Sequence, residues 1–170
     1  QMCIRDSNKN YTKFTKSLKS TQNYYNETKS LSAIDIKEFS FLYILLKKPE
    51  LIKVNFNLIE NVKLFSSENK LLFEEIINQT DNFENTNIES LKIDQGLIER
   101  VLKYASIKHI LVKNLNDDQK ILEILSELIR DLKNYELELR ITDLESRLSK
   151  DLSEATFNEL KELKKQQKIN

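Results

Sequence analysis

The scarcity of glycine and proline is the feature that most constrains how this chain can fold. Its 170 residues include one Gly and one Pro, whereas average soluble domains carry several-fold more of each. Folds rich in β-strands and doubly wound α/β folds need these residues for their many turns. Charged residues make up 32% of the chain, and Leu, Ile and Lys recur throughout. The sequence therefore predicts an all-α fold whose helices are joined by short polar loops.

The balance of charge disfavours one class of function. The chain has 27 basic and 27 acidic residues, whereas proteins that bind nucleic acid mainly by neutralising phosphates present a basic field. With Cys3 as its only cysteine and His109 as its only histidine, the chain has no intrachain disulfide or Cys/His zinc spacing. No apolar run approaches the roughly 18 residues of a membrane span, and no secretory signal is visible. We expect a cytoplasmic protein without a membrane segment, metal or cofactor.

The first 33 residues differ in composition from the rest. Residues 1–7 resemble translated adapter or vector sequence, so we expect an artefact there and a chain that is a piece of a longer protein. Residues 8–33 are rich in Asn, Lys, Ser and Thr and poor in apolar side chains. Such a segment buries too little apolar surface to order itself, which predicts a flexible polar linker. Contact of its lysines and aromatic residues with single-stranded nucleic acid is the open alternative.

Apolar residues at helical spacing predict a helical bundle over residues 34–113. Ser32 or Asp35 can cap the first helix, and Pro49 ends it and starts the second. Residues 64–68 combine an apolar staple, a serine cap and an acidic first turn before the third helix. Such short amphipathic helices are stable only when they share one core. The expected helices lie at about residues 34–48, 49–61, 68–77, 88–93 and 97–111.

Residues 114–170 are expected to form a long helix followed by a C-terminal helical hairpin. Asn116 caps the long helix, which runs to about Lys150. Its apolar residues form two stripes with heptad steps, rotated by roughly 200° from one another. The first stripe is Ile121, Leu125, Leu128, Leu132, Tyr135 and Leu139, and the second is Leu137, Ile141, Leu144 and Leu148.

The change of stripe near Leu137 implies that the long helix has two packing partners. Its first half is expected to pack on the bundle. Its second half is expected to pack on a last helix, which begins after a turn at residues 151–154 and carries Phe157, Leu160 and Leu163. A two-helix hairpin buries little surface, so this one is a plausible docking element for another protein.

The chain offers few residues for chemistry. Gly96 is the only glycine, so there is no glycine-rich phosphate loop. His109 is expected to be partly buried or at the surface of a helix, and Tyr135 is expected to pack in the seam. Glu74 and Glu75 are adjacent on a helix and therefore do not face one another. The sequence predicts no catalytic, metal-binding or cofactor-binding residue and no small-molecule substrate.

Two stretches, residues 36–52 and 144–163, resemble the C-terminal helicase-binding region of bacterial DNA primases of the DnaG type. The first, IKEFSFLYILLKKPELI, is similar to that region's opening helix and its His-Pro-Glu-Leu-Leu turn, with Lys48 in place of His or Asn. Phe65-Ser66-Ser67 is similar to the family's Phe-Ser-Asp turn. The second stretch, LESRLSKDLSEATFNELKEL, is similar to the terminal hairpin.

This resemblance implies a bundle and a hairpin joined by one long helix. It also implies a partner, the amino-terminal domain of the DnaB-type replicative helicase, and a role in coupling primer synthesis to the replication fork. The family's zinc-binding and polymerase domains lie upstream, so this fragment is expected to be non-catalytic, and its helical part is not expected to contact nucleic acid directly. The expected helicase contacts, divided between holding the hairpin and touching the partner, are Leu148, Leu152, Phe157, Leu160 and Leu163.

Two other readings stay open. The amino-terminal domain of the replicative helicase has a similar bundle, and residues 39–77 fit either protein, although the terminal hairpin favours primase. A generic helical or coiled-coil interaction module is the second alternative, but it predicts one uninterrupted heptad seam. An enzyme is the least favoured class.

Overall fold

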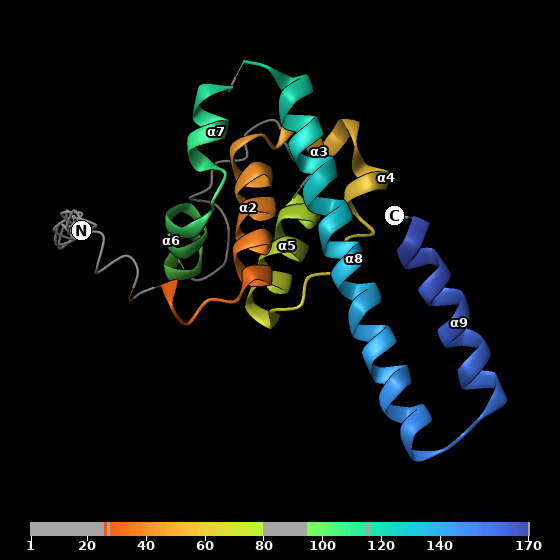
Figure 1. Ribbon diagram of the computed structural model, residues 1–170. Coiled ribbons are helices and arrows are strands. Elements are labelled where there is room, and N and C mark those ends of the chain that lie inside the picture. Colours follow the sequence, from red (N-terminus) through yellow and green to blue (C-terminus); the bar gives the residue numbers. More distant parts are fainter. Residues whose placement is uncertain (1–25, 27, 80–94, 115, 170) are drawn as a thin grey trace, which may run out of the picture. The chain divides into compact units, whose positions relative to one another are not determined.

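The computed structural model describes residues 26, 28–79, 95–114 and 116–169. The chain divides into two units, Gln1–Ser30 and Leu31–Asn170, and the helices labelled α2 to α9 all belong to the second (Figure 1). The described residues contain no β-strand, so the all-α fold is confirmed. The segment at 1–7, most of the linker expected at 8–33 and the helix expected near 88–93 lie outside the described residues.

Helix α2 (Ala33–Lys47) is the centre of the bundle. Ser32 caps it in a capping box: its Oγ accepts from the Asp35 N–H at 3.2 Å, and the Asp35 carboxylate accepts from the Ser32 N–H at 2.8 Å. Every residue from Glu38 to Leu46 is buried. A helix that is buried around its whole circumference needs neighbours on all sides, and these neighbours form the rest of the bundle.

Among the described helices, the main neighbours of α2 are α5 (Ser67–Gln79), α6 (Gln95–Tyr104), α7 (Lys108–Lys113) and the first half of α8 (Asp118–Lys150). Figure 1 shows α2 between α6 and α8. The short helices α3 (Glu50–Val54) and α4 (Phe56–Ile59) follow α2. The largest fully buried side chains of this bundle are Phe39, Phe41, Leu42, Ile44, Leu45, Ile52, Ile59, Leu72, Ile98, Leu111, Ile121 and Leu125.

Two helices that the sequence predicts as continuous are interrupted. The segment 49–61 breaks at Asn55, whose side-chain amide donates to the Leu51 carbonyl at 3.1 Å. The segment 97–111 breaks at Ala105–Ile107, where the Ser106 N–H donates to Ser40 Oγ of α2 at 3.1 Å. In both places a polar side chain satisfies a backbone group, and this local bonding competes with continued helix.

The cap of the long helix also differs from the prediction by one residue. Asp117, not Asn116, caps α8, because its carboxylate accepts from the Lys120 N–H at 3.0 Å. A charged cap also interacts favourably with the positive end of the helix dipole. The Lys48 ammonium at the end of α2 pairs with Asp118 at 3.0 Å, and this pairing raises the pKa of Lys48.

The buried carboxylate of Glu38 joins α2 to the start of α5. It accepts from the backbone N–H groups of Phe65 and Ser66 and, at 2.6 Å, from the side-chain amide of Asn69. These groups precede or lie in the first turn of α5, where backbone donors have no helical acceptor. Burial raises the pKa of the Glu38 carboxyl despite the three donors, and the nearby Asp35 adds to the rise.

The two halves of α8 pack in two separate cores, as the change of stripe predicts. Ile121, Leu125, Leu128, Ile129 and Leu132 belong to the core of the bundle. A second, small core consists of Ile141 and Leu144 of α8 and Leu160 and Leu163 of α9 (Glu154–Ile169), with Leu137 and Leu148 packed against it. The long helix and the terminal hairpin are therefore confirmed, and the boundary at residues 113 and 114 stays a prediction.

The Glu38 contact generates a prediction about stability. Glu38→Ala should lower the free energy of unfolding by about 2–4 kcal/mol, because it leaves buried donors of Phe65, Ser66 and Asn69 unsatisfied. Chemical denaturation followed by circular dichroism measures this change. Glu60→Ala removes an exposed carboxylate and should change stability by less than about 0.5 kcal/mol.

The same pair of proteins should respond differently to pH. Since burial raises the pKa of Glu38 in the folded state, its protonated form favours folding, and this contribution is lost as pH rises through the raised value. The stability advantage of the wild type over Glu38→Ala should therefore shrink as pH rises from below the ordinary Glu value of 4.5 to neutrality. An advantage that grows over this interval would contradict the assigned direction.

Candidate interaction surface

The structure divides the five predicted contact residues into two groups. Leu160 and Leu163 are buried, with 7% and 8% of their surface exposed, and Leu148 is half-buried beside them. Leu152 is 89% exposed and Phe157 is 54% exposed. The first group holds the hairpin together, and the second offers apolar surface to a partner.

The turn between α8 and α9 positions this exposed pair. The Asp151 N–H donates to the Arg147 carbonyl at 2.9 Å, which ends α8, and the Ser153 N–H donates to the Asp151 carbonyl at 3.0 Å. Leu152 lies between these bonds and carries its side chain into solvent. The Phe157 N–H then donates to the Ser153 carbonyl at 3.0 Å, in the first turn of α9.

Two ion pairs connect the helices of the hairpin. Arg140 pairs with Glu159, and Lys164 pairs with Glu145 at 2.6 Å. Each pair is exposed and adds no more than about 1 kcal/mol, since solvent screens it. The small apolar core therefore provides most of the stabilisation of the hairpin.

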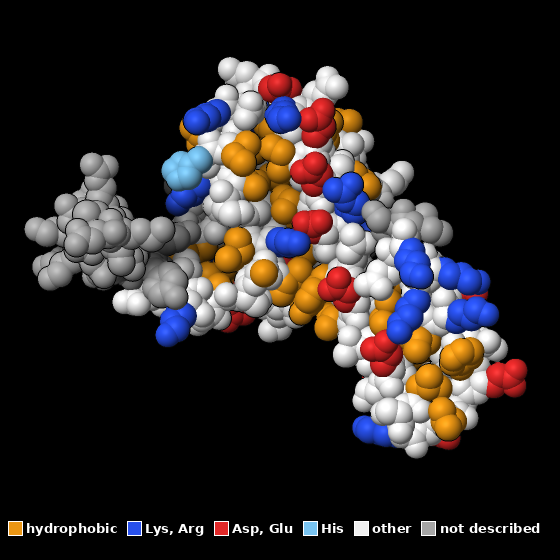
Figure 2. Space-filling model, viewed as in Figure 1, with side chains coloured by type: hydrophobic (Ala, Val, Ile, Leu, Met, Phe, Trp, Pro, Cys, Tyr) orange, Lys and Arg blue, Asp and Glu red, His pale blue; other side chains and the backbone are white. Residues whose placement is uncertain are grey.

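A groove of about 400 Å³ runs along the surface of α9. It is lined by residues at successive helical steps of three, one, three, one and three, so they lie on one face. The lining residues are Phe157, Leu160, Lys161, Lys164, Lys165 and Lys168. Every charged group in this lining is cationic. Figure 2 shows the hairpin with Lys and Arg side chains gathered beside exposed hydrophobic ones.

The four groove lysines differ in their partners. Lys164 pairs with Glu145, and Lys165 pairs with Glu162 at 2.7 Å. The Lys165 ammonium lowers the pKa of the Glu162 carboxyl. Among the described residues, no carboxylate lies within ion-pair distance of Lys161 or Lys168. These two ammonium groups are therefore less engaged within the chain than those of Lys164 and Lys165, although Lys161 also interacts electrostatically with Glu162.

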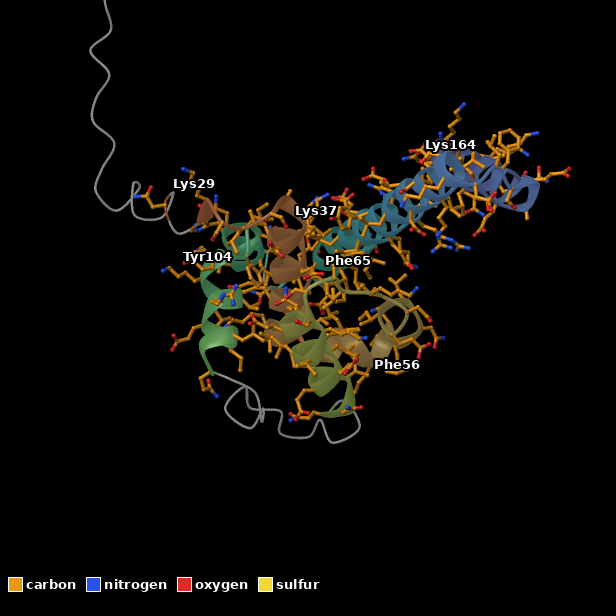
Figure 3. The ribbon with its side chains drawn as sticks, turned by 90° about the horizontal axis from the view of Figure 1, so that it is seen from below. Lys29, Lys37, Phe56, Phe65, Tyr104 and Lys164 are labelled. Atoms are coloured by element: carbon orange, nitrogen blue, oxygen red, sulfur yellow. The ribbon has the colours of Figure 1, made fainter. Side chains whose placement is uncertain are left out.

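A second hollow, of about 350 Å³, lies where the start of α2 meets α8. Its wall includes the ion pair of Lys37 with Asp131 at 2.9 Å. Tyr135 also lines it and meets the ring of Phe65 edge-on, with 4.8 Å between ring centroids. Figure 3 shows Lys37 and Phe65 at this junction and Lys164 out on the hairpin. Tyr135 is thus packed, as its position in the seam predicts.

The other residues considered for chemistry are dispersed. His109 is exposed on α7. Glu74 is exposed and pairs with Lys70 at 3.9 Å, whereas Glu75 accepts from the side chain of Gln79 at 2.7 Å. Within the described part of the chain, no three His, Cys, Asp or Glu side chains come together as metal ligands. The described helices also include none that is long and apolar enough to cross a membrane.

The groove lysines are functional candidates that the sequence analysis does not single out. The signal that identifies them is their spacing from Phe157, because positions four, seven, eight and eleven residues further along a helix lie on one side of it. Comparison with known proteins adds no candidate: no family model, curated protein or solved structure matches the chain.

The division between buried and exposed residues predicts different effects of truncation. Leu160→Ala should open the hairpin core and reduce amide-exchange protection in α9, because removing a buried Leu costs about 2–5 kcal/mol. Leu152→Ala should leave that protection within about twofold of wild type, because its side chain is already in solvent. Hydrogen exchange by mass spectrometry resolves α9 from the bundle. Equal loss of protection in both variants would contradict the assignment.

Proposed function

We propose that this chain is the non-catalytic C-terminal region of a bacterial DnaG-type primase and docks on the replicative helicase. The partner surface is the amino-terminal domain of the DnaB-type helicase. In this proposal the contact couples primer synthesis to the replication fork in the cytoplasm. In the family that the chain resembles, zinc binding and primer synthesis belong to other domains, and the role proposed for this chain is docking alone.

The observation that carries the proposal is the exposed apolar pair on the hairpin. Leu152 and Phe157 lie on an element whose own core is already filled by Leu144, Leu160 and Leu163. Apolar side chains that the hairpin does not need for its own stability favour a binding role, since aromatic and aliphatic anchors dominate protein interfaces. The resemblance of residues 144–163 to the primase hairpin supplies the identity of the partner.

The arrangement of α8 supports the same proposal over its two alternatives. A single coiled coil would keep one seam, whereas Leu125 and Leu144 of α8 belong to different cores. Residues 39–77 fit the helicase's own amino-terminal domain as well, but residues 144–163 resemble the primase hairpin. The primase reading accounts for the bundle, the continuous α8 and the hairpin together.

The proposal predicts that Phe157→Ala weakens binding to the amino-terminal domain of the same organism's DnaB-type helicase by about tenfold or more. Loss of a central aromatic anchor typically costs about 1–4 kcal/mol of binding free energy. Isothermal titration calorimetry with the full chain measures the affinity. Circular dichroism should show unchanged helix content, because Phe157 is not part of the hairpin core.

Leu71→Ala is the matched control for this experiment. Leu71 is 63% exposed, like Phe157, but it lies on α5 of the bundle. It should bind the helicase domain with wild-type affinity. If the wild-type chain does not bind this domain at all, the proposed function is wrong. If it binds and Phe157→Ala binds equally well, the hairpin is not the contact.

A further inference from the structure

We propose that the groove along α9 binds an acidic amphipathic helix of the partner protein. This inference rests on the proposed function for the identity of the partner, and it deepens that function by assigning the chemistry of the contact. Its basis is the juxtaposition of the Phe157 and Leu160 side chains with four lysines on one face of one helix.

The apolar part of the groove determines the kind of side chain that fits it. Phe157 offers a half-exposed ring, and the methylene stems of Lys161, Lys164 and Lys165 extend the apolar surface beside it. Aliphatic anchors on a partner helix can bury this surface, while the lysine head groups stay at the rim. This is the usual arrangement of a helix bound in a groove, with an apolar floor and a charged border.

The length of the groove fits a short helix. From Phe157 to Lys168 the axis of α9 rises about 16 Å, at about 1.5 Å per residue. A partner helix of about three turns spans this distance, with apolar residues at positions i, i+3, i+4 and i+7. Its flanking positions then lie near the ammonium groups.

The charges of the groove require the partner's flanking positions to be acidic. Lys161 and Lys168 lie seven residues apart, or about two helical turns, and have no ion-pair partner among the described residues. Carboxylates two turns apart on a partner helix match this separation. Glu145 and Glu162 already neutralise Lys164 and Lys165 in part, so Lys161 and Lys168 provide most of the attraction. Complementary charge of this kind sets the selectivity and the rate of association more than the affinity.

A single strand of nucleic acid fits the groove less well. Surfaces that bind such strands stack successive bases on several aromatic side chains, whereas Phe157 is the only aromatic residue in this lining. Outside the groove lining, α9 also carries the carboxylates of Glu154, Glu159 and Glu162, which repel a phosphate backbone. Protein carboxylates are therefore the favoured ligand.

Fluorescence anisotropy with the full chain and three labelled probes tests this inference. The first probe is a designed amphipathic peptide of about three turns with Leu on one face and Glu on its flanks. The second is the same peptide with Lys in place of each Glu, and the third is a strand of about 15 thymidines. The acidic peptide should bind saturably, and the basic peptide should bind at least about tenfold more weakly.

The double variant Lys161→Glu/Lys168→Glu should weaken binding of the acidic peptide by about tenfold or more, since it replaces attraction by repulsion. Lys161→Gln/Lys168→Gln should have a smaller effect in the same direction. Because it removes the charges without reversing them, it controls for unfolding caused by the charge reversal. The matched control, Lys113→Glu/Lys133→Glu, changes net charge equally at exposed positions of α7 and α8. It should alter the affinity by less than about twofold.

The outcomes separate this inference from the proposed function. Equal binding of the acidic and basic peptides, or loss of only the thymidine strand in the charge-reversed variant, would overturn the acidic-helix assignment. Helicase-domain binding that is unchanged in that variant would also overturn it, while leaving the proposed function intact. Binding of the acidic peptide by a chain that does not bind the helicase domain would instead reject the helicase as partner.

Discussion

The complete burial of α2 is the constraint on which the bundle depends. Nine consecutive residues, Glu38 to Leu46, are withdrawn from water, so each side of the helix must be covered by another element. The carboxyl group of Glu38 in this run is satisfied because the chain returns to it with the backbone donors at the start of α5. Glu38 and the apolar side chains around it thus together determine where α5 begins. A buried carboxyl group with several donors favours one arrangement of helices, because other arrangements leave its polar atoms unsatisfied.

Much of the fold follows from local pattern. The cap at Ser32 or Asp35, the end of α2 before Pro49 and the shift of stripe in α8 are all short-range signals. The structure confirms them and identifies Ser32 as the cap. The breaks at Asn55 and Ala105–Ile107 were not predictable in this way. The second depends on Ser40, which is 66 residues away in sequence and bonds to Ser106. The role of Glu38 is likewise set by residues 27 to 31 positions away, and a single sequence carries no sign of such pairings.

The candidate surface was predictable to a similar extent. The apolar pattern and the resemblance of residues 144–163 together predicted Leu148, Leu152, Phe157, Leu160 and Leu163 on the hairpin, but they could not say which of them face α8. That division depends on the rotation of α9 about its axis, which the packing of Leu160 and Leu163 on Ile141 and Leu144 determines. Once this rotation is fixed, Phe157 and the lysines that follow it lie together on the exposed side. The groove is therefore a product of tertiary structure, although each of its residues is visible in the sequence.

The unbroken course of α8 has a mechanical consequence. From Leu132, the last residue that α8 contributes to the bundle core, to Lys150 at its end, the helix rises about 27 Å at about 1.5 Å per residue. Because no proline or helix break interrupts this span, a change in the tilt of α8 at the bundle also changes the position of its far end. A tilt of α8 by about 10° at Leu132 moves Lys150 by about 5 Å over that length. A small change of packing around Leu128 and Leu132 would therefore be amplified at the turn between α8 and α9.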